Sequence, residues 1–175
     1  MLMNYKEKLN QVTTIVLDVD GVLTDGRILI TTEGEMYRQM HTKDGYALKA
    51  ALDAGLKVAI ISGGTNEGVR NRLKALGVYD IYLGAHHKME AYQDLMDSYD
   101  LDPMNILYMG DDIPDIPVME KVGVACCPQD AVSDVKAIAD YISHIDGGMG
   151  CVRDIVEQTL RVQGKWGNLN SAKND

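Results

Sequence analysis

Short runs of apolar, mostly β-branched residues recur along the chain and alternate with longer stretches in which apolar residues return at helical spacing. Continuous apolar runs of this length are typical of strands in a parallel sheet that is covered on both faces. Five such runs predict strands: Thr14–Asp20, Lys57–Ile61, Asp80–Leu83, Asn105–Met109 and Gly123–Ala125.

The stretches between these runs predict helices, because their apolar residues fall on one helical face. They are Asp44–Ala54, Asn66–Leu76, Lys88–Tyr99 and Val152–Val162. The first two end at Gly55 and Gly77, and glycine is a common signal for the C-terminus of a helix. Strands that alternate with helices imply right-handed βαβ crossovers, so the predicted fold is α/β, with a doubly wound, mostly parallel Rossmann-like sheet.

One segment, residues 26–41, breaks the alternation and is typical of a β-hairpin inserted after the first strand. Its two halves meet at Glu33 and Gly34, a turn signal between two strand-like runs. Its apolar side chains do not sort onto one face, and an isolated hairpin is only marginally stable in water. We therefore expect this hairpin to serve oligomerisation. No other segment is long enough to form a cap domain over the sheet.

The chain has 175 residues, of which 46% are hydrophobic and 25% charged, a balance typical of a globular protein rather than a disordered one. This length fits one domain, so we predict a single domain over residues 1–175. Its polar end, residues 168–175, is expected to be a flexible tail.

Acidic residues outnumber basic ones, 26 to 17, for a net charge of −9, and the cations are scattered. Such a chain is repelled by nucleic acid and by anionic membrane surfaces, so neither is an expected partner. No apolar run approaches the roughly 20 residues that span a bilayer, and residues 1–14 lack the apolar core of a signal peptide. We expect a cytoplasmic protein that holds a small anionic molecule with a few placed Lys and Arg side chains.

Three cysteines, two of them adjacent, are too few and odd in number for a disulfide framework. We predict that all three are reduced thiols. The alternative is a zinc site, but no CxxC or HxxxH spacing supports it. That site would draw on Cys126, Cys127, Cys151, His86 and His87.

Polar residues follow the ends of the predicted strands, where ligands bind in open α/β sheets. They include Asp18 and Asp20 after the first strand, Ser62, Gly63 and Gly64 after the second, Lys88 after the third, and Asp111, Asp112 and Asp115 after the fourth. A single aspartate there is commonly a helix cap. Two carboxylates ~4 Å apart repel by about 4 kcal/mol at an effective dielectric near 20, so a cluster predicts a hard cation, and oxygen ligands suit Mg²⁺.

These residues stand in four motifs that resemble those of the haloacid dehalogenase superfamily of phosphotransferases. The first is Asp18-Val-Asp20-Gly-Val-Leu-Thr-Asp25-Gly, Ser62 fits the second, Lys88 the third, and Gly110-Asp111-Asp112-Ile-Pro-Asp115 the fourth. The chain is similar to one capless branch in particular, the 3-deoxy-D-manno-octulosonate 8-phosphate phosphatases. Further segments carry that likeness: the hairpin, His41–Tyr46, Pro117–Gly123 and Gly147–Arg153.

The resemblance implies a mechanism with separate roles. Asp18 is implied as the nucleophile that forms an aspartyl-phosphate, and Asp20 as the general acid and base. Ser62 is implied to bind a phosphoryl oxygen, and Lys88 to offset negative charge. Mg²⁺ is implied to lie between the Asp18 side chain, the Asp20 carbonyl and Asp111; the same comparison makes Asp112 and Asp115 residues that orient metal-bound waters, with direct contact by Asp112 left open.

The resemblance also implies a sugar acid phosphate as substrate and a homotetramer, in which the hairpins form a central barrel and a neighbour covers each active site. Family positions that contact the substrate match Asp20, His41, Thr42, Lys43, Asp44, Gly45, Lys49, Gly63, Gly64, Arg72 and Lys88. One departure concerns Gly64, where family members often carry an arginine. His86 and His87 are also unusual, and one of them is a possible replacement.

Three alternatives stay open at this point. A relative in the same branch acts on the nine-carbon 2-keto-3-deoxynononate 9-phosphate, and the missing arginine leaves that substrate possible. A non-catalytic binding module on this fold is disfavoured, because no motif carboxylate is missing. A phosphotransferase or mutase is disfavoured because such enzymes need a cap that excludes water.

Overall fold

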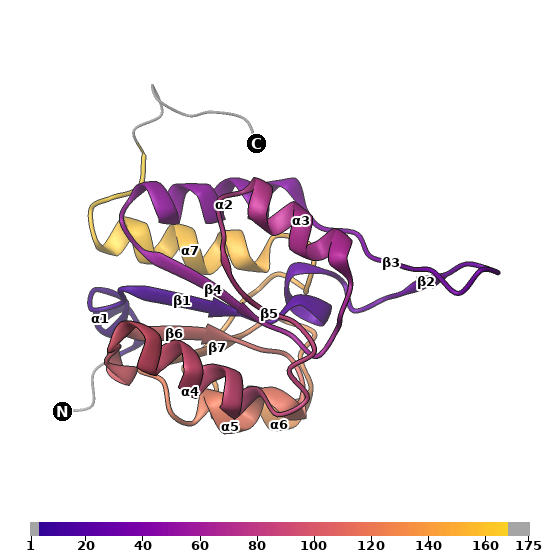
Figure 1. Ribbon diagram of the computed structural model, residues 1–175. Helices are drawn as coiled ribbons and strands as arrows, with labels where there is room; N and C mark the ends of the chain where they lie inside the picture. Colours follow the sequence, from indigo (N-terminus) through magenta and orange to yellow (C-terminus); the bar gives the residue numbers. More distant parts are fainter. Residues whose placement is uncertain (1–3, 168–175) are drawn as a thin grey trace.

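A computed structural model describes residues 4–167 of the protein, so the tail predicted to be flexible lies outside the described residues. Its centre is a sheet of six parallel strands (Figure 1). In sheet order these are β5 (Asp80–Tyr82), β4 (Lys57–Ile61), β1 (Thr14–Leu17), β6 (Ile106–Met109), β7 (Val124–Cys127) and β8 (Tyr141–Ile142). The predicted α/β fold with a parallel, doubly wound sheet is confirmed.

Helices cover both faces of this sheet (Figure 1). On one face lie α2 (Thr42–Asp53), α3 (Glu67–Ala75) and α7 (Cys151–Val162), and on the other lie α4 (Lys88–Tyr99), α5 (Ile116–Met119) and α6 (Ser133–Ile138). A short helix, α1 (Tyr5–Leu9), packs against α7 and β7. Within residues 4–167 no segment forms a cap domain over the strand ends.

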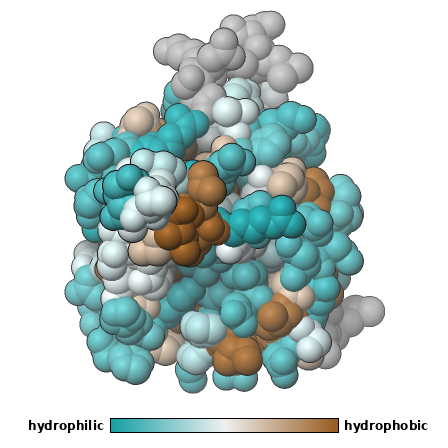
Figure 2. All heavy atoms as spheres, turned by 90° about the vertical axis from the view of Figure 1, so that its right-hand side faces the viewer, coloured by the Kyte–Doolittle hydropathy of each residue, from teal (hydrophilic) through white to brown (hydrophobic). Residues whose placement is uncertain are grey.

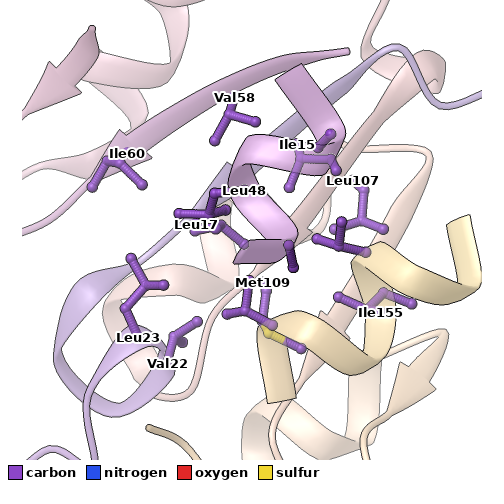
Figure 3. Packing of buried hydrophobic residues seen from close by; sticks show 14 of the residues in the cluster. Ile15, Leu17, Val22, Leu23, Leu48, Val58, Ile60, Leu107, Met109 and Ile155 are labelled. Atoms are coloured by element: carbon purple, nitrogen blue, oxygen red, sulfur yellow. The ribbon is translucent and has the colours of Figure 1, made fainter. Parts of the chain in front are cut away.

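Alternate residues of each buried strand feed two hydrophobic cores. In β1, Ile15 and Leu17 face the core under α2 and α7 (Figure 3). Val16, between them, faces the core under α4. All four residues of β1 are buried, because the strand has a neighbour on each side and a helical layer on each face. This packing fixes the end of β1, and with it the position of Asp18.

The hairpin predicted at residues 26–41 is present and projects from the body of the molecule (Figure 1). Its strands, β2 (Leu29–Ile30) and β3 (Met36–Tyr37), are two residues each and pair only with each other. Leu29 and Ile30 are both 67% exposed. When the molecule is viewed along the hairpin toward its body, hydrophobic atoms gather near the centre of the face (Figure 2).

The strand and helix boundaries differ from the sequence prediction in a few places. β1 ends at Leu17, and the next residues form a tight turn, Val19–Leu23, in which Gly21 has a φ of 88°. Helix α2 begins at Thr42, with His41 as its N-cap, two residues earlier than predicted. Four short elements were not predicted from the sequence: α1, α5, α6 and β8.

All three cysteines are buried free thiols. Cys126 and Cys127 are consecutive residues of β7 and therefore belong to opposite cores. Among the described residues, the one group of side chains close enough to share a metal consists of aspartates, so the zinc alternative finds no support. None of the helices in residues 4–167 has the length and apolar character needed to cross a membrane.

Candidate active site

The carboxyl ends of β1, β4 and β6 and the start of α4 meet at one cleft of about 440 Å³. Lining it are all nine of the strand-end residues that the sequence analysis names: Asp18, Asp20, Ser62, Gly63, Gly64, Lys88, Asp111, Asp112 and Asp115. Gly26, Ala85, His86 and Pro114 complete the lining. The prediction that these side chains lie together is a consequence of parallel topology, which brings the strand ends to one edge.

Lys88 is the buried cation at the floor of this cleft. Its Nζ lies 2.8 Å from Asp18 Oδ2 and 2.6 Å from Asp115 Oδ1. Burial acts to lower the pKa of Lys88, but the two carboxylates outweigh burial and raise it. The ammonium therefore stays charged at neutral pH and holds Asp18 in a fixed orientation.

Asp115 is fully occupied as a hydrogen-bond acceptor. Besides Lys88, its Oδ1 accepts from the hydroxyl of the buried Tyr108 at 2.6 Å. Its Oδ2 accepts from the backbone N–H groups of Asp111 and Asp112, at 3.0 and 3.3 Å. This arrangement makes Asp115 a clamp that orders the loop after β6, and Tyr108 is a supporting residue that sequence reasoning missed because it reads as a core tyrosine.

Asp111 supplies the clearest opening for a cation. Its Oδ1 is buried without a hydrogen-bond partner, and oxygens of Asp18, Asp111 and Asp115 all lie within 4.8 Å of one another. Burial and the neighbouring carboxylates raise the pKa of Asp111 to about 7, and burial followed by Asp115 raises that of Asp18 to about 6. An unpartnered oxygen among carboxyl groups whose pKa values are raised fits a divalent cation. The cation would give that oxygen a partner and would offset the repulsion between the carboxylates.

Gly21 leaves the space that Asp111 occupies. A Cβ built on Gly21 would come within 2.0 Å of Asp111 Oδ2, and its positive φ is one that residues with side chains rarely adopt. The turn after β1 therefore needs glycine at this position for two independent reasons.

Asp20 stands at the mouth of the cleft and is held by the hairpin. Arg38, just after β3, donates from Nε to Asp20 Oδ1 at 2.6 Å and from Nη2 to Oδ2 at 3.1 Å. The hydrogen bonds to Asp20 raise the pKa of Arg38. Sequence reasoning missed Arg38, because nothing in a hairpin pattern says which side chain turns back toward the sheet.

The loop after β4 also lines the cleft. Ser62 is buried, and its Oγ accepts a hydrogen bond from the N–H of Gly64 at 3.3 Å. A Cβ on Gly64 would lie 3.3 Å from both Arg38 Nη2 and Asp20 Oδ2. Of the two histidines noted in the sequence, His86 lines the cleft, whereas His87 occupies the N-cap position of α4 without a side-chain cap bond.

Asp112, which is predicted to orient metal-bound waters, lines the cleft and caps a short turn, because its Oδ1 accepts from the N–H of Ile113 at 2.7 Å.

Other predicted substrate contacts lie outside this cleft. Asp44 is buried and accepts from the N–H of Arg153 at 2.7 Å. The remaining members are in or beside α2 and α3: His41, Thr42, Lys43, Gly45, Lys49 and Arg72. Their contact with a substrate stays a prediction.

Arg72 lines a second hollow, of about 420 Å³, between the hairpin and α3. It shares this hollow with Tyr37, Arg38, Met40, Asn66, Gly68 and Val69. Asn66 ties the two sides together, because its Nδ2 donates to the carbonyl of Met36 at 2.9 Å. The second hollow therefore opens beside the cleft, with Arg38 contacting Asp20 of the cleft and lining the hollow itself.

Residues 77–147 match the family model of haloacid dehalogenase-like hydrolases. The chain is also 40% identical to the 3-deoxy-D-manno-octulosonate 8-phosphate phosphatase of Salmonella typhi, over 95% of this chain and 87% of that protein. The enzyme of the same name from Escherichia coli strain K12 is 39% identical over the same shares.

Solved structures agree with this likeness. The 3-deoxy-D-manno-octulosonate 8-phosphate phosphatase of Yersinia pestis superposes with a TM-score of 0.91 at 31% identity, covering 97% of this chain and 90% of that one. The enzyme of the same name from Moraxella catarrhalis, in complex with magnesium ion, phosphate ion and a KDO molecule, gives 0.88 at 31% identity, covering 91% of each chain.

Proposed function

The chain belongs to the haloacid dehalogenase-like hydrolases, in the branch of the 3-deoxy-D-manno-octulosonate 8-phosphate phosphatases, and on that premise we propose that it is a Mg²⁺-dependent phosphatase of this sugar acid phosphate. The products are the free sugar acid and phosphate. The observation that carries the proposal is Asp18 at the end of the central strand, held by Lys88 beside the unpartnered oxygen of Asp111.

The chain's own residues supply the parts of a double displacement. Asp18 attacks phosphorus in line, the bond from phosphorus to the sugar oxygen breaks, and an aspartyl-phosphate forms. Asp20 donates a proton to the departing sugar oxygen and then takes one from the water that releases phosphate from Asp18. Lys88 and the Ser62 hydroxyl stabilise the phosphoryl oxygens as charge moves onto them.

A Mg²⁺ ion held by the side chains of Asp18 and Asp111 and by the Asp20 carbonyl would add charge stabilisation at the phosphoryl oxygens. Asp115 keeps the loop that carries Asp111 in place, because its Oδ2 accepts from the backbone N–H groups of Asp111 and Asp112. Asp112, which also lines the cleft, would orient water molecules bound to the ion.

The assembly belongs to the same proposal. The exposed apolar hairpin supports a homotetramer in which hairpins pack together and a neighbouring subunit covers each cleft. A cytoplasmic location and a single domain over residues 1–175 complete it.

The first experiment is phosphate release with and without Mg²⁺ from a panel of purified phosphate esters. The panel holds the eight-carbon and nine-carbon keto sugar acid phosphates, hexose phosphates and an aryl phosphate. We expect kcat/KM to be at least ~100-fold higher for the octulosonate phosphate than for the hexose phosphates, about 2.7 kcal/mol of discrimination.

A preference for the nine-carbon acid would keep the mechanism and change the substrate; the glycine at position 64, where relatives often carry an arginine, is the feature that favours this second candidate. No release from any ester by the folded protein with Mg²⁺ would overturn the enzyme.

A further inference from the structure

Arg38 is a largely buried cation beside the candidate active site. Its side chain is 8% exposed, whereas that of its partner Asp20 is 32% exposed. It reaches the cleft from the end of β3 in the hairpin, where it bonds to Asp20, and it also lines the second hollow between the hairpin and α3. Arg38 therefore connects the cleft to the hollow beside it.

The chemistry of this contact is that of carboxylate recognition. The guanidinium gives two parallel hydrogen bonds to one carboxylate, the geometry for which arginine is favoured over lysine. In this arrangement both Asp20 oxygens accept from Arg38, so the guanidinium holds the carboxylate in one orientation. A second carboxylate that took over the guanidinium would release Asp20.

The proposed substrate carries such a carboxylate. Its phosphate is on carbon eight and its carboxylate is on carbon one, at opposite ends of the molecule. When the phosphoryl group lies at Asp18 and Lys88, the acid end therefore lies away from these residues, and the second hollow offers space for it beside Asp20. That hollow is lined by two arginines, Arg38 and Arg72, and by the apolar side chains of Met40 and Val69.

Gly64 gives Arg38 its room. The nearest atoms to a Cβ built there are Arg38 Nη2 and Asp20 Oδ2, both at 3.3 Å. A longer side chain at this position would take the volume that the guanidinium now fills. The absence of a side chain at residue 64 and the presence of Arg38 are therefore parts of one arrangement.

We propose that Arg38 is a specificity-determining residue that binds the carboxylate of the sugar acid and, in doing so, exchanges its hydrogen bonds from Asp20 to the substrate. This inference rests on the proposed function, because the carboxylate that Arg38 binds belongs to the proposed substrate. The substrate thereby frees Asp20 for proton transfer as it binds, which couples recognition of the acid end to chemistry at the phosphate end.

The test compares Arg38→Gln with Arg27→Gln, a matched loss of charge from the same hairpin at a side chain that is 91% exposed. For each variant, kcat/KM is measured for the octulosonate phosphate and for 4-nitrophenyl phosphate, which has no carboxylate. Arg38→Gln should lower the ratio of the two at least ~30-fold, about 2 kcal/mol, mainly through KM for the sugar acid. Arg27→Gln should change the ratio less than ~3-fold.

Two further variants separate charge from geometry. Arg38→Lys should recover only part of the ratio, because lysine keeps the charge and loses the planar fork. The double variant Arg38→Gln with Gly64→Arg restores a cation from the loop after β4 and should recover more. Melting temperatures confirm that each variant is folded.

Binding of the free sugar acid by calorimetry separates this inference from the proposed function, because it needs no turnover. Arg38→Gln should weaken that binding at least ~10-fold, whether or not the protein hydrolyses the octulosonate phosphate. Unchanged binding and an unchanged ratio overturn the role of Arg38. Equal losses for both esters, with a displaced pH profile of kcat, also overturn it, since Arg38 would then act only through Asp20.

Discussion

Three aspartates of the cleft differ in the number of hydrogen-bond donors that surround their carboxylates. Asp115 has four hydrogen-bond donors, Asp18 has Lys88 and one backbone N–H, and Asp111 has a buried oxygen with none. Burial is the main cause that raises the pKa of Asp18 to about 6 and that of Asp111 to about 7, and the lower value belongs to the residue that Lys88 also holds by a hydrogen bond. The residue with least support is the one best suited to hold a cation.

Asp18→Asn removes the nucleophile and should lower kcat by at least ~10³-fold. The fold should survive, because burial raises the pKa of Asp18 to about 6 and its charge is therefore costly in the absence of a cation. Phosphate release at saturating substrate and Mg²⁺ measures the effect, with circular dichroism as the check on folding. Activity within tenfold of the native protein would remove Asp18 from the proposed role.

Asp44 makes a separate prediction about stability. Burial raises its pKa from 3.8 to about 6, and its Oδ2 has no partner. The neutral acid thus favours the folded state, a contribution that is fully present below pH 3.8 and is lost as pH rises through about 6. Between pH 4 and 7.5 the native protein should lose about 2 to 3 kcal/mol of unfolding free energy relative to Asp44→Asn.

Urea unfolding across that pH range measures this difference. Asp53→Asn is the matched control, since Asp53 is an exposed aspartate at the end of the same helix. Parallel pH curves for the native protein and Asp44→Asn would show that Asp44 does not carry the pH dependence.

At the scale of the element, the turn after β1 determines whether the cation site can form. Gly21→Ala places a Cβ against Asp111 Oδ2 and adds strain at a φ of 88°. We expect it to weaken Mg²⁺ activation at least ~10-fold and to lower stability by about 1 to 3 kcal/mol. A Mg²⁺ titration of phosphate release tests this, with Gly34→Ala as the control, a glycine of similar φ with open space around it.

If Gly21→Ala and Gly34→Ala had the same Mg²⁺ dependence, the contact between Gly21 and Asp111 would have no part in cation binding. Equal losses of stability without a change in Mg²⁺ activation would assign the glycine to backbone conformation alone.

The sequence was sufficient for elements that bury a continuous apolar run. β1, β4 and β6 and the helix α4 lie where their patterns predict them, because burial on two faces leaves a strong signal. β8 is two residues long and α6 is six, so neither is long enough to show a period. Their positions depend on tertiary contacts that a local pattern does not contain.

The strand-end residues of the site were predictable for the same reason, since topology brings them together once the strands are known. Arg38 and Tyr108 could not be predicted from the sequence. Arg38 follows a hairpin strand and Tyr108 belongs to a buried strand, and only their side-chain hydrogen bonds connect them to the site. The hydrogen bond that the buried Asp44 accepts likewise comes from a residue far along the chain, the backbone N–H of Arg153. Contacts of this kind become visible only in three dimensions.

At the scale of the whole molecule, the hairpin gathers five exposed large apolar side chains in one projecting segment of residues 4–167: Ile28, Leu29, Ile30, Met36 and Tyr37. Leu29→Thr combined with Ile30→Lys replaces two side chains that are each 67% exposed and should not disturb either core. If the proposed tetramer forms through the hairpins, the variant should sediment as smaller species than the native protein, with its melting temperature falling as the assembly is lost. Val162→Lys, at an exposed site on α7, is the control. An unchanged sedimentation coefficient would place the interface elsewhere.

The order of the strands in the sheet has a consequence for how this protein is made. β1 lies between β4 and β6, so both neighbours of the strand that carries Asp18 are synthesised after it. While the chain is being synthesised, β1 is complete long before β6, its second neighbour, which ends at residue 109. Until then an apolar strand edge stays open to wrong pairings, and pairing across such sequence distances is slow. The strand that ends at Asp18 is thus the first strand of the sheet to be synthesised, and it is enclosed on both sides only after β6 has been made.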